Sequence, residues 1–140
     1  MFKRSLAILA VIVVAALTTS APRAQPSGQS RGPTVASIKD AIVKATGAES
    51  GTIELTVAAK IFTVKVVNGK FANGTSAGRE NEAGVIESIV ANAIAGKAEF
   101  MGIVVIVVEY VKRGSAGRPR IVDSIEFRKD ATGAFRHHIT

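Results

Sequence analysis

The sequence predicts an α+β fold, in which one antiparallel sheet of about four strands carries two helices packed on one face. Three observations lead to this prediction. Apolar residues recur at helical spacing in residues 76–96, and they follow strand-like alternation in residues 51–69 and on both sides of a turn in residues 120–140. The expected order of elements is helix, strand, helix, strand, strand, strand. Packing both helices on one face of the sheet buries the apolar stripe of each helix, and 140 residues suit a single domain, expected over 34–140.

The first helix and the strand after it are expected over residues 35–46 and 51–69. Val35, Ile38 and Ile42 recur at three- and four-residue steps after Thr34, which suits an N-cap. In 51–69 the apolar residues are odd-numbered at first and even-numbered later. A flat strand cannot bury both sets on one face, so a bulge or a tight turn is expected near residues 58–60. Because these residues include no Gly, Asn, Asp or Pro, the sequence favours one long bulged strand over a hairpin.

The clearest helical pattern lies in residues 76–96. Ser76 suits the N-cap, Gly96 suits the stop, and the apolar residues between them form one stripe. These residues are Val85, Ile86, Ile89, Val90, Ala93 and Ile94. The stretch VKVVNG, residues 64–69, stands before this helix and a strand, and there the chain resembles the BON domain of periplasmic proteins. This resemblance covers about half of the chain and does not include its C-terminal hairpin.

The stretch from Gly102 to Arg113, GIVVIVVEYVKR, is expected to form a central strand over about 103–112. Its six consecutive aliphatic residues are too few to span a membrane. As a strand it has two apolar faces: Ile103, Val105, Val107 and Val111 line the first, and Val104, Ile106, Val108 and Tyr110 line the second. We expect the helices to cover the first face. Nothing in the sequence plainly covers the second face, which leaves it open to a second copy of the chain, a ligand or residues 25–33.

A β-hairpin is expected at the C-terminus. Residues 130–133, DATG, fit a type I turn that ends in a left-handed glycine. With this loop, Phe127 faces His137 on an apolar side, and Arg128 faces Arg136 on a polar side. The polar side also carries Arg120, Ser124, Glu126 and His138.

The N-terminus has the layout of a secretory signal peptide over residues 1–24. Lys3 and Arg4 precede an apolar run of twelve residues, and small residues follow it. Because no twin arginine is present, the pattern favours Sec-type export to the periplasm or the cell exterior; an uncleaved membrane anchor is the alternative. Residues 25–33 are polar and rich in Gly, Pro and Ser, which predicts a flexible leader. The chain contains no cysteine, which excludes disulfides, thiolate catalysis and cysteine-bound metals.

The charge pattern points to an anionic partner. The formal charge is +7, and loss of residues 1–24 removes three basic residues and leaves +4. Arg128 opposite Arg136 is a like-charge pair, which costs stability, so a bound anion would relieve the repulsion. We therefore expect Arg120, Arg128, Arg136, His138 and Glu126 to belong to a binding face for a phosphate-rich polymer or a lipid head group. A modest charge and the lack of aromatic residues on that side disfavour sequence-specific nucleic-acid recognition.

Candidate catalytic residues are few. Asp123 falls on the apolar side of the hairpin and Glu109 interrupts an apolar strand, so either carboxylate becomes an acid–base candidate if it is buried in a pocket. His137 and His138 are neighbours on a strand and point to opposite faces, so they cannot share a metal ion. Ser124, His138 and Glu126 contain the residue types of a nucleophilic triad, but an open sheet face provides no oxyanion hole.

These observations favour a small exported protein that acts by binding or association, without a catalytic site, a cofactor or a metal. Two alternatives stay open. One is a small cofactor-free hydrolase or isomerase that uses Asp123 or Glu109 in a pocket. The other is a self-associating structural protein.

Overall fold

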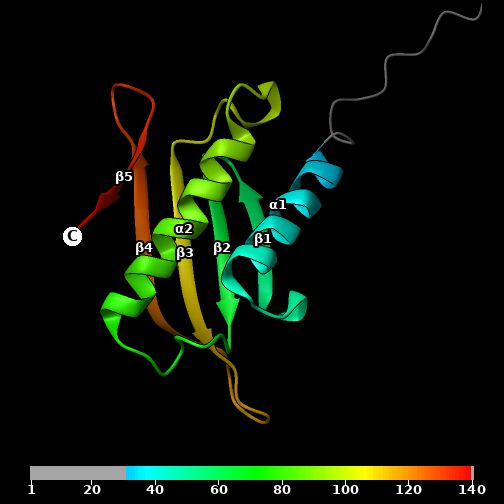
Figure 1. The fold of residues 1–140 in the computed structure, drawn as a ribbon, viewed down its shortest axis with the longest axis vertical. Helices are drawn as coiled ribbons and strands as arrows, with labels where there is room; N and C mark the ends of the chain where they lie inside the picture. Colours follow the sequence, from blue (N-terminus) through cyan, green and yellow to red (C-terminus); the bar gives the residue numbers. More distant parts are fainter. Residues whose placement is uncertain (1–30, 140) are drawn as a thin grey trace, which may run out of the picture.

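The computed structural model describes residues 31–139. The main elements in chain order are α1 (Arg31–Thr46), β1 (Ile53–Ala58), β2 (Ile61–Val67), α2 (Ser76–Ile94), β3 (Val105–Lys112), β4 (Arg120–Lys129) and β5 (Phe135–His138) (Figure 1). The expected signal peptide, and the expected leader up to residue 30, lie outside the described residues. Helix α1 begins at Arg31, inside the segment that the sequence predicted to be a flexible leader. The helix can include Pro33 because this residue lies in the first turn, where a missing N–H costs no helical hydrogen bond. Neither of the two described α-helices is long and apolar enough to cross a membrane.

The predicted α+β class is confirmed. The sheet has five strands in the order β1-β2-β3-β4-β5, where about four were expected. Three neighbouring pairs are antiparallel, and β2 pairs with β3 in parallel. The parallel pair follows from α2, because a helical crossover returns the chain to the end of the sheet from which β2 started. The prediction of a purely antiparallel sheet was therefore wrong at this one pair.

The extra strand comes from residues 53–67, which form a hairpin in place of the one long bulged strand favoured by the sequence. Ala58 pairs with Ile61, so Ala59 and Lys60 alone make the turn. Ala59 adopts the left-handed region, with φ 50°. The expected break was at the right place, but its form was wrong, because an alanine takes a conformation that usually selects Gly, Asn or Asp.

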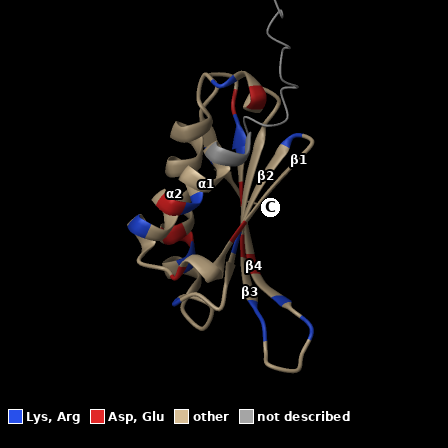
Figure 2. Ribbon diagram, turned by 90° about the vertical axis from the view of Figure 1, so that its right-hand side faces the viewer, with Lys and Arg blue, Asp and Glu red and all other residues tan. Residues whose placement is uncertain are grey.

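Both helices pack on one face of the sheet, as predicted (Figure 2). The core lies between the two layers and is formed mainly by Ile38, Ile42, Phe62, Val64, Ile86, Val90, Ile106, Val108 and Tyr110. In α2 the buried row is Glu82, Ile86, Val90 and Ile94, while Val85 is exposed. The N-cap of α2 is Thr75, whose side chain accepts a hydrogen bond from Gly78 N at 3.1 Å; the sequence analysis had assigned this role to Ser76.

β3 is the middle strand, as predicted, but the helices cover the opposite face to the one expected. Ile106, Val108 and Tyr110 point under the helices and are fully buried. Val105 and Val107 point to the side without helices and are half-buried. Both faces of the strand are apolar, so the alternation alone could not decide between them. The neighbouring strands decide, because Phe62 on β2 and Phe127 on β4 flank Ile106.

Candidate functional site

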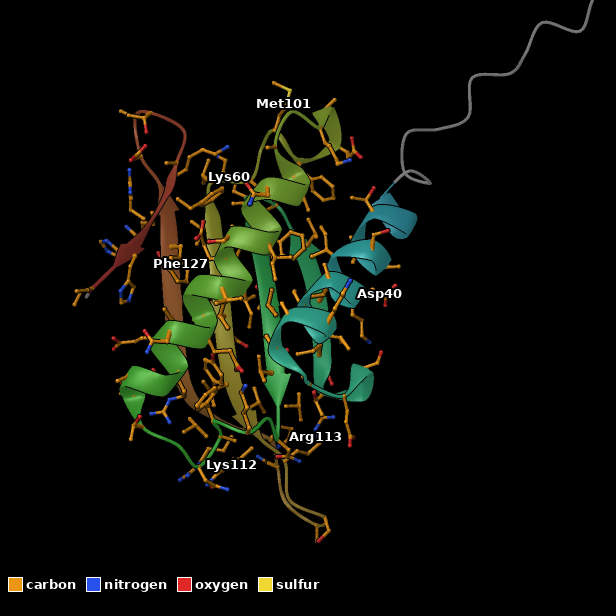
Figure 3. The ribbon with its side chains drawn as sticks, viewed as in Figure 1. Asp40, Lys60, Met101, Lys112, Arg113 and Phe127 are labelled. Atoms are coloured by element: carbon orange, nitrogen blue, oxygen red, sulfur yellow. The ribbon has the colours of Figure 1, made fainter. Side chains whose placement is uncertain are left out.

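The loop that joins β3 to β4, together with the strand residues at its two ends, carries the densest positive charge in the described chain. Residues 112–120, KRGSAGRPR, contain four basic residues and no acidic one; we call them the basic arm. The arm projects beyond the end of the sheet (Figures 1 and 2), and Lys112 and Arg113 lie at its base (Figure 3). Residues 113–120 are exposed and Lys112 is half-buried. No ion pair is recorded for Lys112, Arg118 or Arg120 within residues 31–139, whereas Arg113 contacts Glu54 at 3.3 Å. The arm therefore presents largely uncompensated charge to solvent.

Asn68 fixes the base of the basic arm. Its side-chain Nδ2 donates to Arg113 O at 2.9 Å, and its Oδ1 accepts from Arg113 N at 2.8 Å. Its own backbone N–H donates to Val111 O at 2.8 Å. Asn68 has a φ of 52°, a left-handed conformation that asparagine tolerates better than most residues. The start of the arm is thus tied to the end of β2.

The predicted binding face of the C-terminal hairpin is largely neutralised within the chain. Arg128 does lie opposite Arg136, as the sequence predicted. However, Arg128 Nε contacts Glu126 Oε1, and Arg136 Nε lies 3.2 Å from Asp130 Oδ2. Each arginine therefore has its own acidic partner, and repulsion between them supplies little reason to bind an anion.

The remaining predicted binding residues divide between two places. Arg120 pairs with Lys112 at the far end of β4. It lies eight residues from Arg128 along the strand, which is about 27 Å at a rise of about 3.4 Å per residue. It belongs to the basic arm and not to the hairpin face. His138 lies opposite Glu126, and His137 stacks on Phe127 with ring centroids 5.5 Å apart. The two histidines point to opposite faces, and residues 31–139 hold no cluster of three or more His, Asp or Glu side chains suited to a metal ion.

Asp123, the first candidate acid, lies at the rim of the helix-covered face and is paired. Arg79 Nε donates to Asp123 Oδ2 at 2.7 Å, and Asp123 Oδ1 accepts from Ser124 N. The same guanidinium donates to Phe71 O and Gly74 O, at 3.3 and 2.8 Å. Asp123 therefore holds Arg79 in place to fasten the loop ahead of α2. This arrangement leaves no open approach for a substrate.

Glu109, the second candidate acid, lies on the side of the sheet without helices. Its carboxylate is 3.7 Å from Lys65 Nζ on the neighbouring strand. Lys65 is in turn opposite Glu54 on β1. Oppositely charged neighbours of this kind stabilise a sheet surface. An open sheet face offers no enclosed space for catalysis.

The acid in the most confined position, Glu82, was missed by the sequence analysis. Its side chain is only 7% exposed, and its Oε1 has no hydrogen-bond partner among the described residues. Burial raises the pKa of Glu82, while the Lys70 ammonium opposes this rise. The Tyr110 hydroxyl lies beside it, and burial together with the Glu82 charge raises the Tyr110 pKa as well. That hydroxyl donates a hydrogen bond to Arg79 O at 2.9 Å.

The side of the sheet opposite the helices has no cover from residues 31–139 (Figure 2). We call it the uncovered face. A row of small and apolar side chains crosses its upper part, namely Ala58, Ile61 and Val105, with Thr56, Thr63 and Val107 in the next row. Ile61 is 42% exposed. Charged residues on β4 and β5 border these rows, an arrangement typical of protein interfaces.

No family model, no curated protein and no solved structure matches this chain. The resemblance to BON domains thus has no support from these comparisons.

Proposed function

We propose that the chain is a small exported protein that acts by binding, without catalysis, and that its basic arm attaches it to a phosphate-bearing surface. The observation that carries this proposal is the arm itself, with four basic residues and no acid in nine exposed or half-exposed positions. Near an anionic membrane each Lys or Arg contributes about 1 kcal/mol, so an arm of this charge gives useful affinity without a pocket.

The composition of the arm fits attachment to a surface. Its tip, Gly114–Gly117, is small and polar, which suits contact by charge and not insertion of apolar side chains. The two hydrogen bonds between Asn68 and Arg113 hold the start of the arm to the sheet, which limits the entropy that the arm loses on binding.

The test uses the chain from Gln25 onward, which contains every described residue, and two phosphate sources. Vesicles that contain phosphatidylglycerol and soluble long-chain polyphosphate are titrated separately, with phosphatidylcholine vesicles as the neutral control. We expect binding to one or both anionic probes that weakens as salt rises, and none to the neutral vesicles. Binding to only one of the anionic probes identifies the source of the phosphate. Binding to neutral vesicles as strong as to anionic ones would contradict the proposal.

A second candidate function is self-association through the uncovered face. It is favoured by the exposure of Ile61 and by the adjoining apolar positions Val105 and Val107. The face proposed for association is the one that carries Val105 and Val107, since the helices bury Ile106 and Val108. An enzyme that uses Asp123 or Glu109 is not favoured, because both acids are held in ion pairs.

A further inference from the structure

The ammonium group of Lys70 occupies a small cation site made by other parts of the chain. Lys70 Nζ donates to Thr46 O at 3.2 Å, lies 3.8 Å from Glu82 Oε2, and stands 5.0 Å from the centre of the Phe71 ring. A carboxylate, a carbonyl and an aromatic face are the groups that recognise an organic ammonium ion. The Lys70 side chain is 61% exposed, so only its end is held in this site.

The surroundings of this site favour a positive charge, although the chain as a whole is basic. A hollow of about 480 Å³ lies beside Lys70, between the end of α1, the end of β2 and α2. Its lining includes two acids, Glu49 and Glu82, and one base, Lys70. Thr46 is the last residue of α1, so the negative end of the helix dipole also points here. Glu82 Oε1, buried and without a hydrogen-bond partner in the described chain, adds unused accepting capacity.

A second hollow that Lys70 also lines suits an alkyl chain. It measures about 400 Å³ and is lined by Ala45, Phe71 and Val85 among others, together with Thr46, Lys70 and Glu82. The two hollows share these last three residues, so they meet at the position of the Lys70 side chain, the Thr46 carbonyl and the Glu82 carboxylate. Movement of the Lys70 side chain into solvent would free the acceptors on Glu82 and Thr46.

We propose that this position binds a ligand with a primary alkylammonium group, whose nitrogen replaces the Lys70 ammonium against Glu82 and the Thr46 carbonyl. The alkyl part of the ligand lies against Phe71 and Val85. Lys70 acts as an internal competitor that keeps the buried carboxylate paired when no ligand is present. This site is separate from the basic arm, and a cationic ligand here does not depend on anion binding there.

The test is a titration with n-butylammonium, followed through the backbone amide NMR signals of Thr46, Lys70 and Glu82. Wild-type protein is expected to give saturable shifts at these residues. In Lys70→Met, which keeps a long apolar side chain without the competing charge, we expect about tenfold tighter binding, because the binding-competent fraction rises. In Glu82→Gln, which keeps the size of the side chain, we expect the saturable shifts to vanish.

The controls separate charge recognition from filling of a hollow. n-Butanol, of similar size but uncharged, is expected to give no saturable shifts. Glu49→Gln tests the outer acid, and we expect it to weaken n-butylammonium binding less than Glu82→Gln does, because Glu49 is exposed. The proposal is overturned if wild-type protein shows no saturable response, if Glu82→Gln binds n-butylammonium as well as wild type, or if n-butanol binds equally. Tighter binding in Lys70→Met without any in wild type would also overturn it, since the site would then exist only after mutation.

Discussion

Arg79 on α2 donates a hydrogen bond of 2.7 Å to Asp123 on β4, across 44 residues of sequence. The two side chains are 12% and 26% exposed, so the bond is mostly shielded from water. We expect Arg79→Met to lower the free energy of unfolding by about 2 kcal/mol, since the mutation leaves a shielded carboxylate without its partner. Urea denaturation measures this change. The exposed arginine of the hairpin provides the control, and Arg136→Met is expected to cost less than about 1 kcal/mol. Equal costs for the two variants would contradict the structural role of Asp123.

Glu82 predicts an unusual dependence of stability on pH. Because burial raises its pKa in the folded state, the unfolded chain releases this proton at lower pH than the folded chain does. Ionisation of Glu82 therefore reduces stability as the pH rises from about 4.5, and the full cost is present above its raised pKa. We expect Glu82→Gln to be more stable than wild type at pH 8, with the difference shrinking toward pH 4. Urea midpoints across this range measure it, and a difference that does not change with pH would contradict the raised pKa.

We expect Asn68 to hold the base of the basic arm in position through its hydrogen bonds to the Arg113 backbone. Replacing it with alanine removes two hydrogen bonds to Arg113 and places a Cβ without polar compensation in a left-handed conformation. We expect Asn68→Ala to cost about 2 kcal/mol, about 1 kcal/mol for the two exposed hydrogen bonds together and about 1 kcal/mol for the strained left-handed backbone. Asn68→Gly is the matched control, because glycine adopts this conformation without strain and should recover about half of the loss. Hydrogen exchange at Arg113 should quicken in both variants; protection unchanged from wild type would show that Asn68 does not hold the arm.

Self-association through the uncovered face predicts an oligomer that one charge can disrupt. We expect Ile61→Lys to convert the protein to a monomer in light scattering, because Ile61 is exposed and lies between Ala58 and Val105, in the middle of the first row. Val85→Lys places the same charge on an exposed position of α2 and should leave the oligomer intact. A wild-type protein that is monomeric at all concentrations would rule out this second candidate function.

The periodic parts of the chain could be predicted from sequence. Two helices, the central position of β3 and the C-terminal hairpin all follow from apolar spacing and a turn that ends in glycine; Gly133 has the expected positive φ of 86°. The hairpin of β1 and β2 did not follow, because Ala59 adopts a turn conformation without a turn residue. The face of β3 that the helices cover also did not follow, since both faces of that strand are apolar.

The candidate sites were harder to predict because they depend on contacts between distant segments. The predicted pairing of Arg128 with Arg136 was right. The ion pair between Arg136 and Asp130 was not predicted, because it forms only when the folded turn brings Asp130 to the Arg136 side chain. Glu82 did leave a signal in the sequence: it precedes Ile86, Val90 and Ile94 at steps of four, and so belongs to the buried row of α2. An acid near the N-terminus of a helix resembles a normal charge that complements the helix dipole, and the burial of Glu82 becomes evident only when Lys70 and Tyr110 are placed around it.

The central claim is that the basic arm binds phosphate-bearing anions, and salt-dependent affinity of charge-matched variants tests it most directly. One variant replaces Lys112, Arg118 and Arg120 with alanine; the other replaces Lys44, Lys60 and Lys97, three exposed lysines elsewhere, so both lose the same charge. Each is titrated with the anionic probe that wild-type protein binds, from low to physiological salt. We predict that the arm variant binds at least about 100-fold more weakly at low salt, at about 1 kcal/mol per residue lost, while the second variant stays within a few-fold of wild type. Equal losses in the two variants would show that only net charge matters and would contradict a role for the arm.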